Sequence, residues 1–564
     1  MSDHAPGPRP DPDQPAPASA APTPPARDSS AQLAAGVRTF GGLTLLSRVL
    51  GLARDLTTVR VFGDTALGSA FTAAFAIPNL FRRLFGEGAL AAAFLPEYAS
   101  LDRDDPRRRD AFATLAIVGL AIVTGAITIL AEVALLAVLL LAPTDADRAL
   151  SLRLIMVMLP FMPMVCIAAI LGAMLQVHGR FGPSAAAPVL LNILMIAAAS
   201  LHFFGPGLDP VSSAYAIGIA AVIAGIGQVA WCLRALRGLS RWTWAPGEVR
   251  DASRRLLRRF LPVVIGLGTI QLNALLDTII AMWPNWFGPT IAGVDYPLDE
   301  RSNAILGYTQ RLYQFPLGVF GIAVATAAFP LLSRHASEPA RFVRTLRDSL
   351  RLSLFIAIPA MVGLILVRDD LVGVVFGGGS PDRMGGFSDD GLARASSVLL
   401  GYSLGIVAYS VNHVLTRAFY ARGDTRTPMK LALGAVALNL SLNLVLIWPM
   451  REAGLAWSTA ISAAAQCVGA WWILRARLPA HADDDRPLLV AFAPALGALA
   501  AMTSLVLLTQ WLVLPGDAAW SSRAIRLGIC SLGGAGVYGA VAWRLGSSEL
   551  RMLIGRGLPT GQAR

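Results

Sequence analysis

The sequence predicts an all-α protein that crosses a membrane many times. Of its 564 residues, 55% are hydrophobic and only 15% are charged, and the mean hydropathy is +0.58. Soluble domains carry about 25% charged residues, so this composition excludes an ordinary soluble protein. Apolar stretches of about 20 residues or more, the length of a spanning helix, recur along the chain. Three arginines, Arg48, Arg54 and Arg311, lie deep inside these stretches rather than near their ends.

We expect about fourteen spanning helices after the first 35 residues. Their ranges are 36–62, 66–88, 111–142, 150–175, 184–204, 212–236, 258–283, 302–332, 346–367, 392–419, 428–449, 453–475, 487–514 and 521–545. Residues 1–35 are rich in Pro, Ala, Asp and Ser. A segment of that composition cannot bury enough apolar surface to offset its ordering entropy, so we expect a disordered tail.

An internal repeat divides the helices into two groups. The segment QVHGRFGPSAAAPVLLNI (176–193) resembles YARGDTRTPMKLALGAVALNL (420–440). Each has a short basic loop with Gly, then Pro at the start of an apolar helix that contains Asn. Transporters built from two similar bundles show such repeats. We therefore expect six helices in residues 36–240, six in residues 241–480, and two more with a C-terminal tail in residues 481–564.

The net charge of +11 does not indicate nucleic-acid binding, because the basic residues are concentrated in alternate loops. The positive-inside rule describes this pattern for cytoplasmic loops. The basic loops of this side are those at 103–109, 178–180, 234–259, 334–347, 422–430 and 475–486. An even number of spans then leaves both termini in the cytoplasm.

Arginines inside the apolar stretches mark the candidate substrate site. Arg48 and Arg54 lie in SRVLGLARD (47–55), and Arg311 lies in QRLYQFPLGVFG (310–321). A charge at bilayer depth is costly, so it usually faces a cavity. A guanidinium binds two phosphate oxygens at once, so these residues predict a cavity for a phosphate-bearing anion. Asp55 offers a second interpretation, in which it neutralises one arginine of its helix as a structural pair.

Two smaller groups leave alternatives open. Arg82 and Arg83 either capture phosphate at the mouth of the cavity or extend to the membrane surface from a helix end. A polar set in the seventh, eleventh and twelfth stretches consists of Asp277, Asn439, Asn443 and Thr459. Its oxygens suit a hard cation such as Na⁺, but interhelical hydrogen bonding also explains such residues.

Nothing in the sequence indicates an enzyme. It has no P-loop, and none of its His and Cys residues has the spacing of a metal site. We expect no cofactor other than Na⁺ as a coupling ion, with the energy supplied by an ion gradient or the membrane potential.

In its motifs the chain resembles the MurJ (MviN) family of lipid II flippases, within the multidrug/oligosaccharidyl-lipid/polysaccharide exporter superfamily. The motifs are SRVLGLARD at 47–55, IPNLFRRLFGEGALAAAFLPEY at 77–98, QRLYQFPLGVFG at 310–321 and AFYARGDTRTPMK at 418–430. The resemblance implies fourteen helices in two lobes, with a V-shaped cavity lined by helices 1, 2, 7 and 8. Helices 13 and 14 would form a groove for a lipid tail.

The resemblance also implies a function. It implies transport of lipid II, the undecaprenyl-diphosphate-linked peptidoglycan precursor, from the inner to the outer leaflet of the bacterial cytoplasmic membrane by alternating access. The family positions tied to cavity function match Arg48, Arg54, Arg82, Arg83 and Arg311, and those of a sodium site match Asp277, Asn439, Asn443 and Thr459. The implied partners are lipid II, membrane lipids and proteins of cell-wall synthesis, and no nucleic acid.

Three positions depart from the pattern of the family. Ser69 and Gln310 stand where family members often have Asp, and Asn443 replaces a sodium ligand that can be Asp. Loss of the first two acids should leave the cavity more positive and argues against a mechanism in which those acids release the head group.

Two other functions remain open from the sequence. A polysaccharide-lipid flippase or another exporter of the superfamily would share the fold, although a drug antiporter should prefer acidic cavity residues for cationic substrates. A non-transporting membrane scaffold for cell-wall synthesis would not need the cavity arginines.

Overall fold

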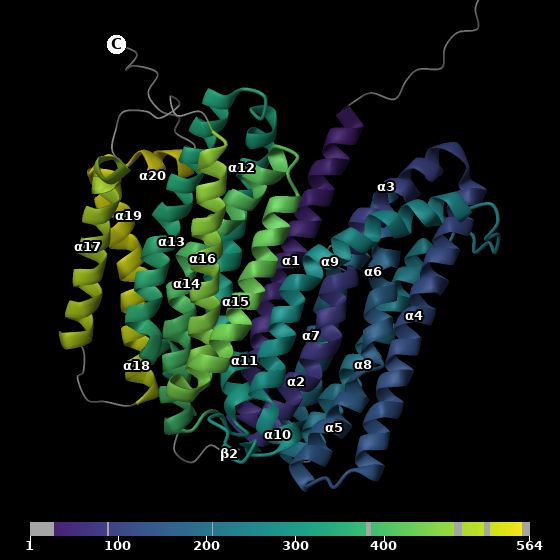
Figure 1. The fold of residues 1–564 in the computed structure, drawn as a ribbon, viewed down its shortest axis with the longest axis horizontal. Coiled ribbons are helices and arrows are strands. Elements are labelled where there is room, and N and C mark those ends of the chain that lie inside the picture. The colour runs from purple at the N-terminus through teal and green to yellow at the C-terminus, as the bar shows by residue number, and fades with distance from the viewer. Residues whose placement is uncertain are drawn as a thin grey trace, which may run out of the picture.

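The computed structural model describes residues 27–86, 89–205, 207–378, 385–478, 488–512 and 519–554. In this part of the chain, helices form the whole architecture apart from one short hairpin, β1 (Thr290–Ile291) and β2 (Val294–Asp295) (Figure 1). Nine helices there are long and apolar enough to cross a membrane. Each of the fourteen expected stretches coincides with one helix or with consecutive helices, apart from a few residues at the ends.

The first helices form one lobe. They are α1 (Arg27–Phe62), α2 (Ala66–Phe81), the π-helical turn η1 (Arg82–Gly86), α3 (Ala89–Asp104), α4 (Pro106–Leu141), α5 (Ala146–Met158), α6 (Phe161–Val177), α7 (Gly182–Phe204) and α8 (Pro210–Leu236). Their buried apolar side chains form a continuous core that runs from Val61 to Leu256.

The second lobe follows in the same order along the chain. It contains α9 (Arg250–Ala281), α10 (Trp283–Phe287), α11 (Ser302–Pro316), the π-helical turn η2 (Leu317–Gly321), α12 (Ile322–Arg334), α13 (Pro339–Phe376), α14 (Asp389–Ala421), α15 (Arg426–Met450) and α16 (Glu452–Ala476). Against α13 pack α17 (Leu488–Leu512), α18 (Trp520–Gly528), η4 (Ile529–Gly533), α19 (Gly534–Arg544) and α20 (Ser548–Leu553).

Two boundaries differ from the expected ones. Helix α1 begins at Arg27. No proline lies between Pro25 and the end of this helix, and its alanines and Leu33 favour a helix. The expected disorder of residues 27–35 is therefore wrong, and residues 1–26 lie outside the described part. The first turns of α9 pack into the first core through Val249, Ala252 and Leu256, so α9 connects the lobes rather than starting cleanly at residue 241.

The two loops of the internal repeat have the same backbone geometry. Gly179 after α6 has φ +72° and Gly423 after α14 has φ +75°, a left-handed conformation that favours glycine. In each loop the amide of the next residue bonds the carbonyl five residues earlier, from Arg180 to Leu175 and from Asp424 to Phe419. Both helices therefore end in the same type of glycine cap.

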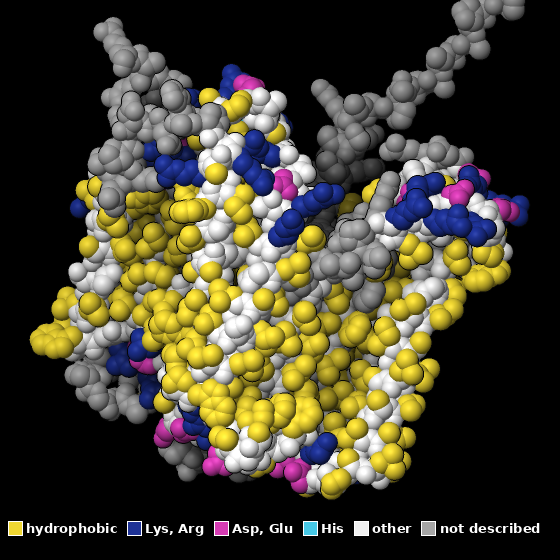
Figure 2. Space-filling view, in the orientation of Figure 1, with side chains coloured by type: hydrophobic (Ala, Val, Ile, Leu, Met, Phe, Trp, Pro, Cys, Tyr) yellow, Lys and Arg dark blue, Asp and Glu magenta, His cyan; other side chains and the backbone are white. Residues whose placement is uncertain are grey.

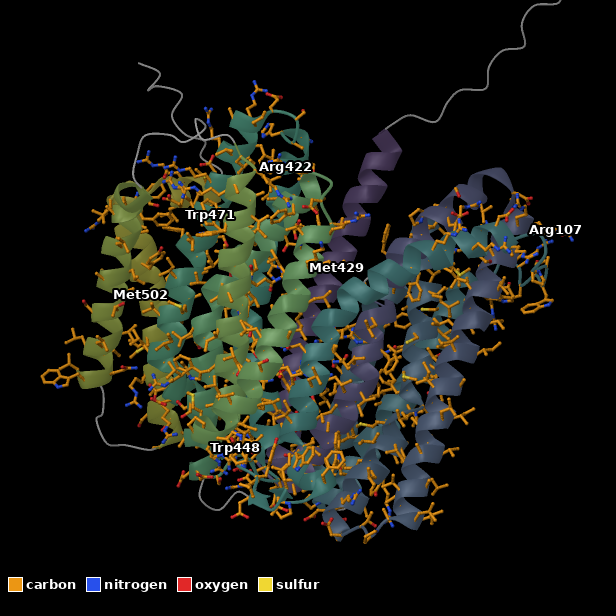
Figure 3. All side chains as sticks on the ribbon, viewed as in Figure 1. Arg107, Arg422, Met429, Trp448, Trp471 and Met502 are labelled. Carbon is orange, nitrogen blue, oxygen red and sulfur yellow. The ribbon has the colours of Figure 1, made fainter. Side chains whose placement is uncertain are left out.

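Basic side chains gather at one end of the molecule. Figure 2 shows Lys and Arg along the upper edge of both lobes, and in Figure 3 Arg107 and Arg422 lie near that end while Trp448 lies near the other. The upper end, in the orientation of Figure 1, is also where α1 begins. Two of the arginine-rich loops predicted to share a side of the membrane therefore lie at the same end.

The lobes are joined at the lower end, where the turn between α1 and α2 contacts the second lobe. The Asp64 carboxylate accepts hydrogen bonds from the amide and hydroxyl of Ser388 at 2.8 and 2.6 Å, and Nη1 of Arg301 lies 3.4 Å away. A Cβ on Gly391 would lie 2.2 Å from a carboxylate oxygen of Asp64. We call Asp64, Arg301 and Ser388 the lower latch.

Candidate functional site

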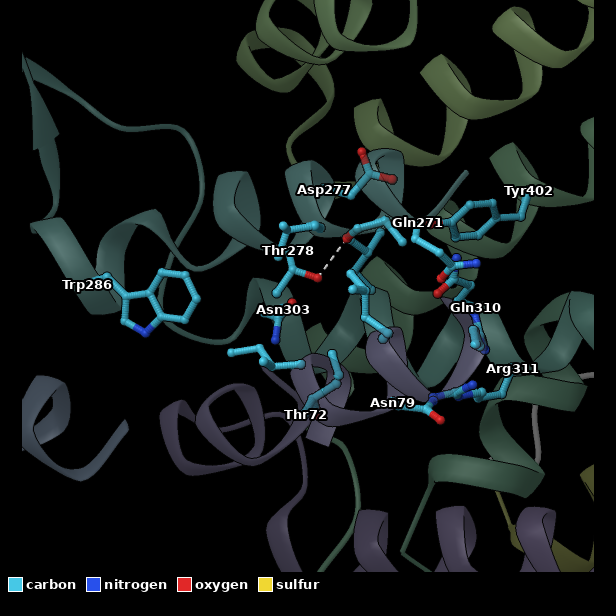
Figure 4. A pocket seen from close by; sticks show the side chains of 18 residues that line it. Thr72, Asn79, Gln271, Asp277, Thr278, Trp286, Asn303, Gln310, Arg311 and Tyr402 are labelled. Atoms are coloured by element: carbon cyan, nitrogen blue, oxygen red, sulfur yellow. Dashed lines mark hydrogen bonds between the residues drawn. The ribbon is translucent and has the colours of Figure 1, made fainter. Parts of the chain in front are cut away.

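A cavity of about 100 Å³ lies where the two lobes meet. Its walls come from α2 and η1 of the first lobe and from α9, α10, α11 and α14 of the second. The polar, charged and aromatic side chains that line it are Thr72, Asn79, Arg83, Gln271, Asp277, Thr278, Trp286, Asn303, Gln310, Arg311 and Tyr402 (Figure 4). Polar groups on walls from both lobes suit a polar ligand within the membrane.

A second cavity of about 30 Å³ adjoins the first and shares Thr72, Gly307 and Arg311 with it. Arg54 and Asp55 from α1 line this second cavity. Arg311 therefore faces both spaces, and the fold brings it close to Arg54 although the two residues lie in different lobes.

Asp55 lies between these two arginines. Its Oδ1 accepts hydrogen bonds from Nε and Nη2 of Arg54 at 3.1 and 2.7 Å, while its Oδ2 lies 3.7 Å from Nε of Arg311. The contact with Arg311 is too long for a hydrogen bond, so it is a looser ion pair. Arg54 is held further by Asn192 Oδ1 at 2.9 Å and lies 4.8 Å over the ring of Phe75.

This arrangement agrees with the interpretation in which Asp55 neutralises one arginine of its own helix, because Asp55 pairs with Arg54. The fold also brings Asp55 of α1 to Arg311, which has no acid within one turn on its own helix. Spacing along one helix cannot identify an ion-pair partner that lies on another helix.

Arg48 lies apart from the two cavities. Its side chain is exposed, and Nη1 would lie 3.1 Å from a Cβ on Gly318, so the guanidinium rests against η2 at a position where glycine leaves room. The contact joins α1 to the helix that carries Arg311, beside the main cavity rather than in its lining.

Arg82 and Arg83 lie in the π-helical turn η1. The Nε of Arg82 donates to Asn79 Oδ1 at 2.8 Å, whereas Arg83 lines the main cavity. Of this pair, only Arg83 has the location expected for a ligand-binding residue.

A proline precedes each of the π-helical turns η1 and η2. Pro78 lies four residues before η1, and Pro316 lies directly before η2. Proline has no N–H to donate and its ring displaces the preceding turn, so the helix must widen or bend there. π-Helical turns are frequent at functional sites, and these two place Arg83 on one wall and Gly318 beside Arg48.

The four residues predicted to hold a cation form a connected chain across α9, α15 and α16. Nδ2 of Asn443 donates to Asp277 Oδ1 at 2.6 Å and to Asn439 Oδ1 at 3.0 Å, and Asn439 Nδ2 donates to Thr459 Oγ1 at 3.2 Å. Asn273 adds a bond to Asp277 Oδ2 at 3.3 Å. The buried Oδ1 of Asn443 has no hydrogen-bond partner among the residues that the structure describes.

Comparison with known proteins gives the family. A family model described as lipid II flippase MurJ matches residues 58–520. The chain belongs to the MurJ family of lipid II flippases. A probable lipid II flippase MurJ of Rhizobium tropici is 33% identical over 445 residues, which cover 75% of this chain and 77% of the relative. One of Rhizobium meliloti is 31% identical over 541 residues, which cover 91% and 94%.

Solved structures give the same fold. A lipid II flippase MurJ in an inward closed conformation has a TM-score of 0.70 at 22% identity, covering 91% of this chain and 99% of its own. An inward-facing multidrug resistance MATE transporter of the MOP superfamily has a TM-score of 0.59 at 14% identity, covering 78% and 97%. The chain is thus a multi-pass membrane protein of a transporter family and not an enzyme.

The two neutral replacements in the MurJ pattern have different positions. Gln310 lines the cavity, as expected. Ser69 is fully buried where α2 meets α11: its Oγ accepts the amide of Ala304 at 2.9 Å, and its carbonyl accepts from Asn303 Nδ2 at 2.9 Å. Ser69 lines neither cavity, so only the replacement at Gln310 lies where it could change the charge of the cavity, and the prediction of a more positive cavity stays a prediction for that position.

Some residues of the site had no clear signal in the sequence. Asn192, which binds Arg54 and the carbonyl of Ser47 at 3.1 Å, was visible only as a lone Asn in an apolar stretch of the repeat. Trp286 follows Pro284 in a five-residue helix outside the expected spans, and nothing in its sequence context distinguished it from other interfacial tryptophans.

Proposed function

We propose that the chain flips lipid II from the inner to the outer leaflet of the bacterial cytoplasmic membrane. The observation that carries the proposal is the pair of arginines, Arg54 and Arg311, which converge from two lobes on Asp55 beside a cavity. The relatives are named as lipid II flippases, which suggests the substrate, and a diphosphate is the ligand that paired guanidinium groups suit.

The ion pair of Asp55 with Arg311 is looser than its pair with Arg54, and this difference suggests how the substrate binds. Arg311 can exchange the carboxylate at 3.7 Å for a diphosphate oxygen, whereas Arg54 remains oriented by Asp55 and Asn192. The site would then need little rearrangement, because one arginine is already positioned and the other loses only a weak partner. Arg83 would add charge from the opposite wall, and Arg48 would contact the substrate where it enters.

Alternating access accounts for movement across the membrane. The polar head group is the part that costs free energy in hydrocarbon, so the protein needs to shield that part alone. In this proposal the arginine-rich end and both termini face the cytoplasm. The lower latch then lies at the outer end of the protein and keeps that end closed. A membrane potential that is negative inside favours outward movement of an anion by about 2.3 kcal/mol per charge per 100 mV.

Sodium is the proposed coupling ion. Asp277, Asn439, Asn443 and Thr459 supply carboxylate, amide and hydroxyl oxygens within one connected group, and the unpartnered Oδ1 of Asn443 fits a cation ligand. Bound Na⁺ would supply positive charge that fixes α9 against α15 and α16. The site borders the cavity through Asp277, so its state is coupled to the substrate space.

The decisive experiment follows lipid II in cells depleted of the protein. An externally added enzyme that cleaves only outward-facing precursor reports on flipping. We expect uncleaved lipid II to accumulate on depletion and wild-type protein to restore cleavage. Arg311→Ala should fail to restore it, whereas Arg334→Ala, a matched change at the exposed end of α12, should succeed.

Other outcomes would support other functions. Restoration by Arg311→Ala at normal membrane levels would remove the arginine from the mechanism and favour a scaffold for cell-wall proteins. Continued cleavage during depletion would contradict lipid II as the substrate. Polyprenyl-diphosphate sugars of other polysaccharides would then be tested for binding.

A further inference from the structure

The main cavity differs chemically between its two sides. Figure 4 shows Arg311 on one side and Trp286 on the opposite side, with Thr278 and Asn303 between them. The side with Arg311 also adjoins the second cavity, which contains Arg54. A head group that extends along this cavity would therefore meet cations at one end and an aromatic ring at the other.

The side near Trp286 is unsuited to a diphosphate. Thr278 donates its hydroxyl to the carbonyl of Ala274 at 2.9 Å, and Asn303 donates its amide to the carbonyl of Ser69 at 2.9 Å. Both side chains therefore offer chiefly acceptor oxygens to the cavity.

Trp286 is positioned by the first lobe. Its indole N–H donates to the hydroxyl of Ser151 at 3.0 Å, and Ser151 is fully buried in α5. Because the only polar group of the ring is occupied, Trp286 can offer a ligand only its aromatic surface. The faces of aromatic rings carry partial negative charge, which attracts the polarised C–H groups of a sugar ring.

We propose that Trp286 is a substrate-positioning residue that packs against a sugar ring of the head group while the diphosphate occupies the side of Arg311. The inference rests on the proposed function and adds an orientation to it. Sugar hydroxyls can donate to the acceptor oxygens of Thr278 and Asn303, whereas the phosphates remain beside the guanidinium groups.

The test compares two ligands that share the diphosphate and lipid but differ in the sugars. Full-length protein in lipid nanodiscs is titrated with undecaprenyl diphosphate and with lipid II. Trp286→Leu should weaken lipid II binding by about three- to tenfold and leave undecaprenyl diphosphate binding unchanged. Trp286→Phe, which keeps an aromatic face, should recover most of the loss.

Trp283→Leu provides the matched control. Trp283 lies on the same helix but packs against Phe287 at 4.6 Å and Tyr296 at 5.8 Å between ring centroids, outside the cavity lining. The Trp283→Leu variant should bind lipid II and undecaprenyl diphosphate as the wild type does. Arg311→Ala should weaken both ligands.

Each remaining outcome overturns a defined claim. Equal weakening of both ligands by Trp286→Leu would show a structural role for the ring and overturn the assignment. Unchanged lipid II binding would overturn it as well. If the wild-type protein fails to bind lipid II at all, the proposed function falls and this assignment falls with it.

Discussion

Asp55 is the residue on which the proposed substrate site depends. It holds Arg54 through two hydrogen bonds and contacts Arg311 only at 3.7 Å. A carboxylate between two guanidinium groups lowers the cost of keeping both charges within the membrane, because each charge is partly compensated. It also leaves one arginine free to exchange its partner for a phosphate.

Asp277 is the residue on which sodium coupling depends. We expect the melting temperature of the wild-type protein to rise with NaCl at constant ionic strength, because a ligand that binds only the folded state stabilises it. Asp277→Asn should remove this rise by eliminating the single carboxylate of the set. Thermal unfolding in NaCl and in choline chloride provides the measurement.

Asp251→Asn is the control for that prediction. Asp251 is an exposed acid in the first turn of the same helix, α9. The Asp251→Asn variant should keep the rise in melting temperature with NaCl. A sodium response that persists in Asp277→Asn would assign the ion to other residues. The four polar side chains would then serve as interhelical hydrogen bonds.

At the scale of elements, the lower latch connects the α1–α2 turn to α11 and α14. A buried carboxylate with two hydrogen bonds and an arginine is worth more than a surface contact, roughly 1.5–3 kcal/mol for a charged hydrogen bond. Gly391 permits the approach, since a Cβ there would meet the Asp64 carboxylate. The latch must open for the lobes to separate at this end.

Asp64→Asn should therefore shift the protein toward a state that is open at the lower end. We expect the ratio of open to closed molecules to rise about tenfold, the effect of losing one charged hydrogen bond. Distances between spin labels at Asp147 and at Trp448, in different lobes, report the change. Asp295 is an exposed acid of the nearby hairpin, and Asp295→Asn should not alter the distances. An unchanged distance distribution in Asp64→Asn would show that the lower latch does not control opening at this end.

At the scale of the whole molecule, a buried ion cluster connects α14, α16 and the loop before α11. Arg394, 8% exposed, lies 2.6 Å from Glu452 and 2.8 Å from Asp299. Arg394→Met leaves two acids without their main partner, so we expect a loss of about 3–5 kcal/mol in the free energy of unfolding. Arg451→Met removes a half-exposed partner of Asp299 and should cost less than about 1 kcal/mol.

Thermal or denaturant unfolding of the two arginine variants measures the difference. Equal losses would contradict the importance of burial in this cluster. A smaller loss for Arg394→Met than for Arg451→Met would place the stabilising contact at the surface instead.

The same cluster predicts a pH dependence of stability. Burial alone would raise the pKa of Asp299, but hydrogen bonds from Arg394 and Ser302 and the charges of Arg394 and Arg451 lower it to about 2. A lowered pKa in the folded state contributes stability above the unfolded value near 3.8, and this is lost as the pH falls through about 2. Asp299 should therefore not contribute to any change in melting temperature between pH 5 and 8.

The Asp299→Asn variant tests this sign. Its difference in stability from the wild type should be constant between pH 5 and 8 and should shrink as the pH approaches 2. A difference that grows toward low pH would contradict the assignment of the pKa.

The sequence by itself determined the elements and the family. Apolar stretches of spanning length, interrupted by Pro and Gly, specify where helices form, and the motifs around Arg48, Arg83 and Arg311 are sufficient to indicate the MurJ family. The repeat was also readable, since glycine at a left-handed turn is a local requirement at Gly179 and Gly423. The helix positions, the motifs and the glycine turns depend on residues that are close together in the sequence.

Only the tertiary structure decided which of these side chains meet. Asp55 pairs with Arg311 across 256 positions, Ser69 is buried at a helix contact, and Trp286 is turned into the cavity by Ser151. Helical spacing assigns partners only within one helix, whereas these contacts depend on how two lobes pack. The physical reason is that the free energy of a charge in a membrane depends on every helix around it, and so on the fold as a whole.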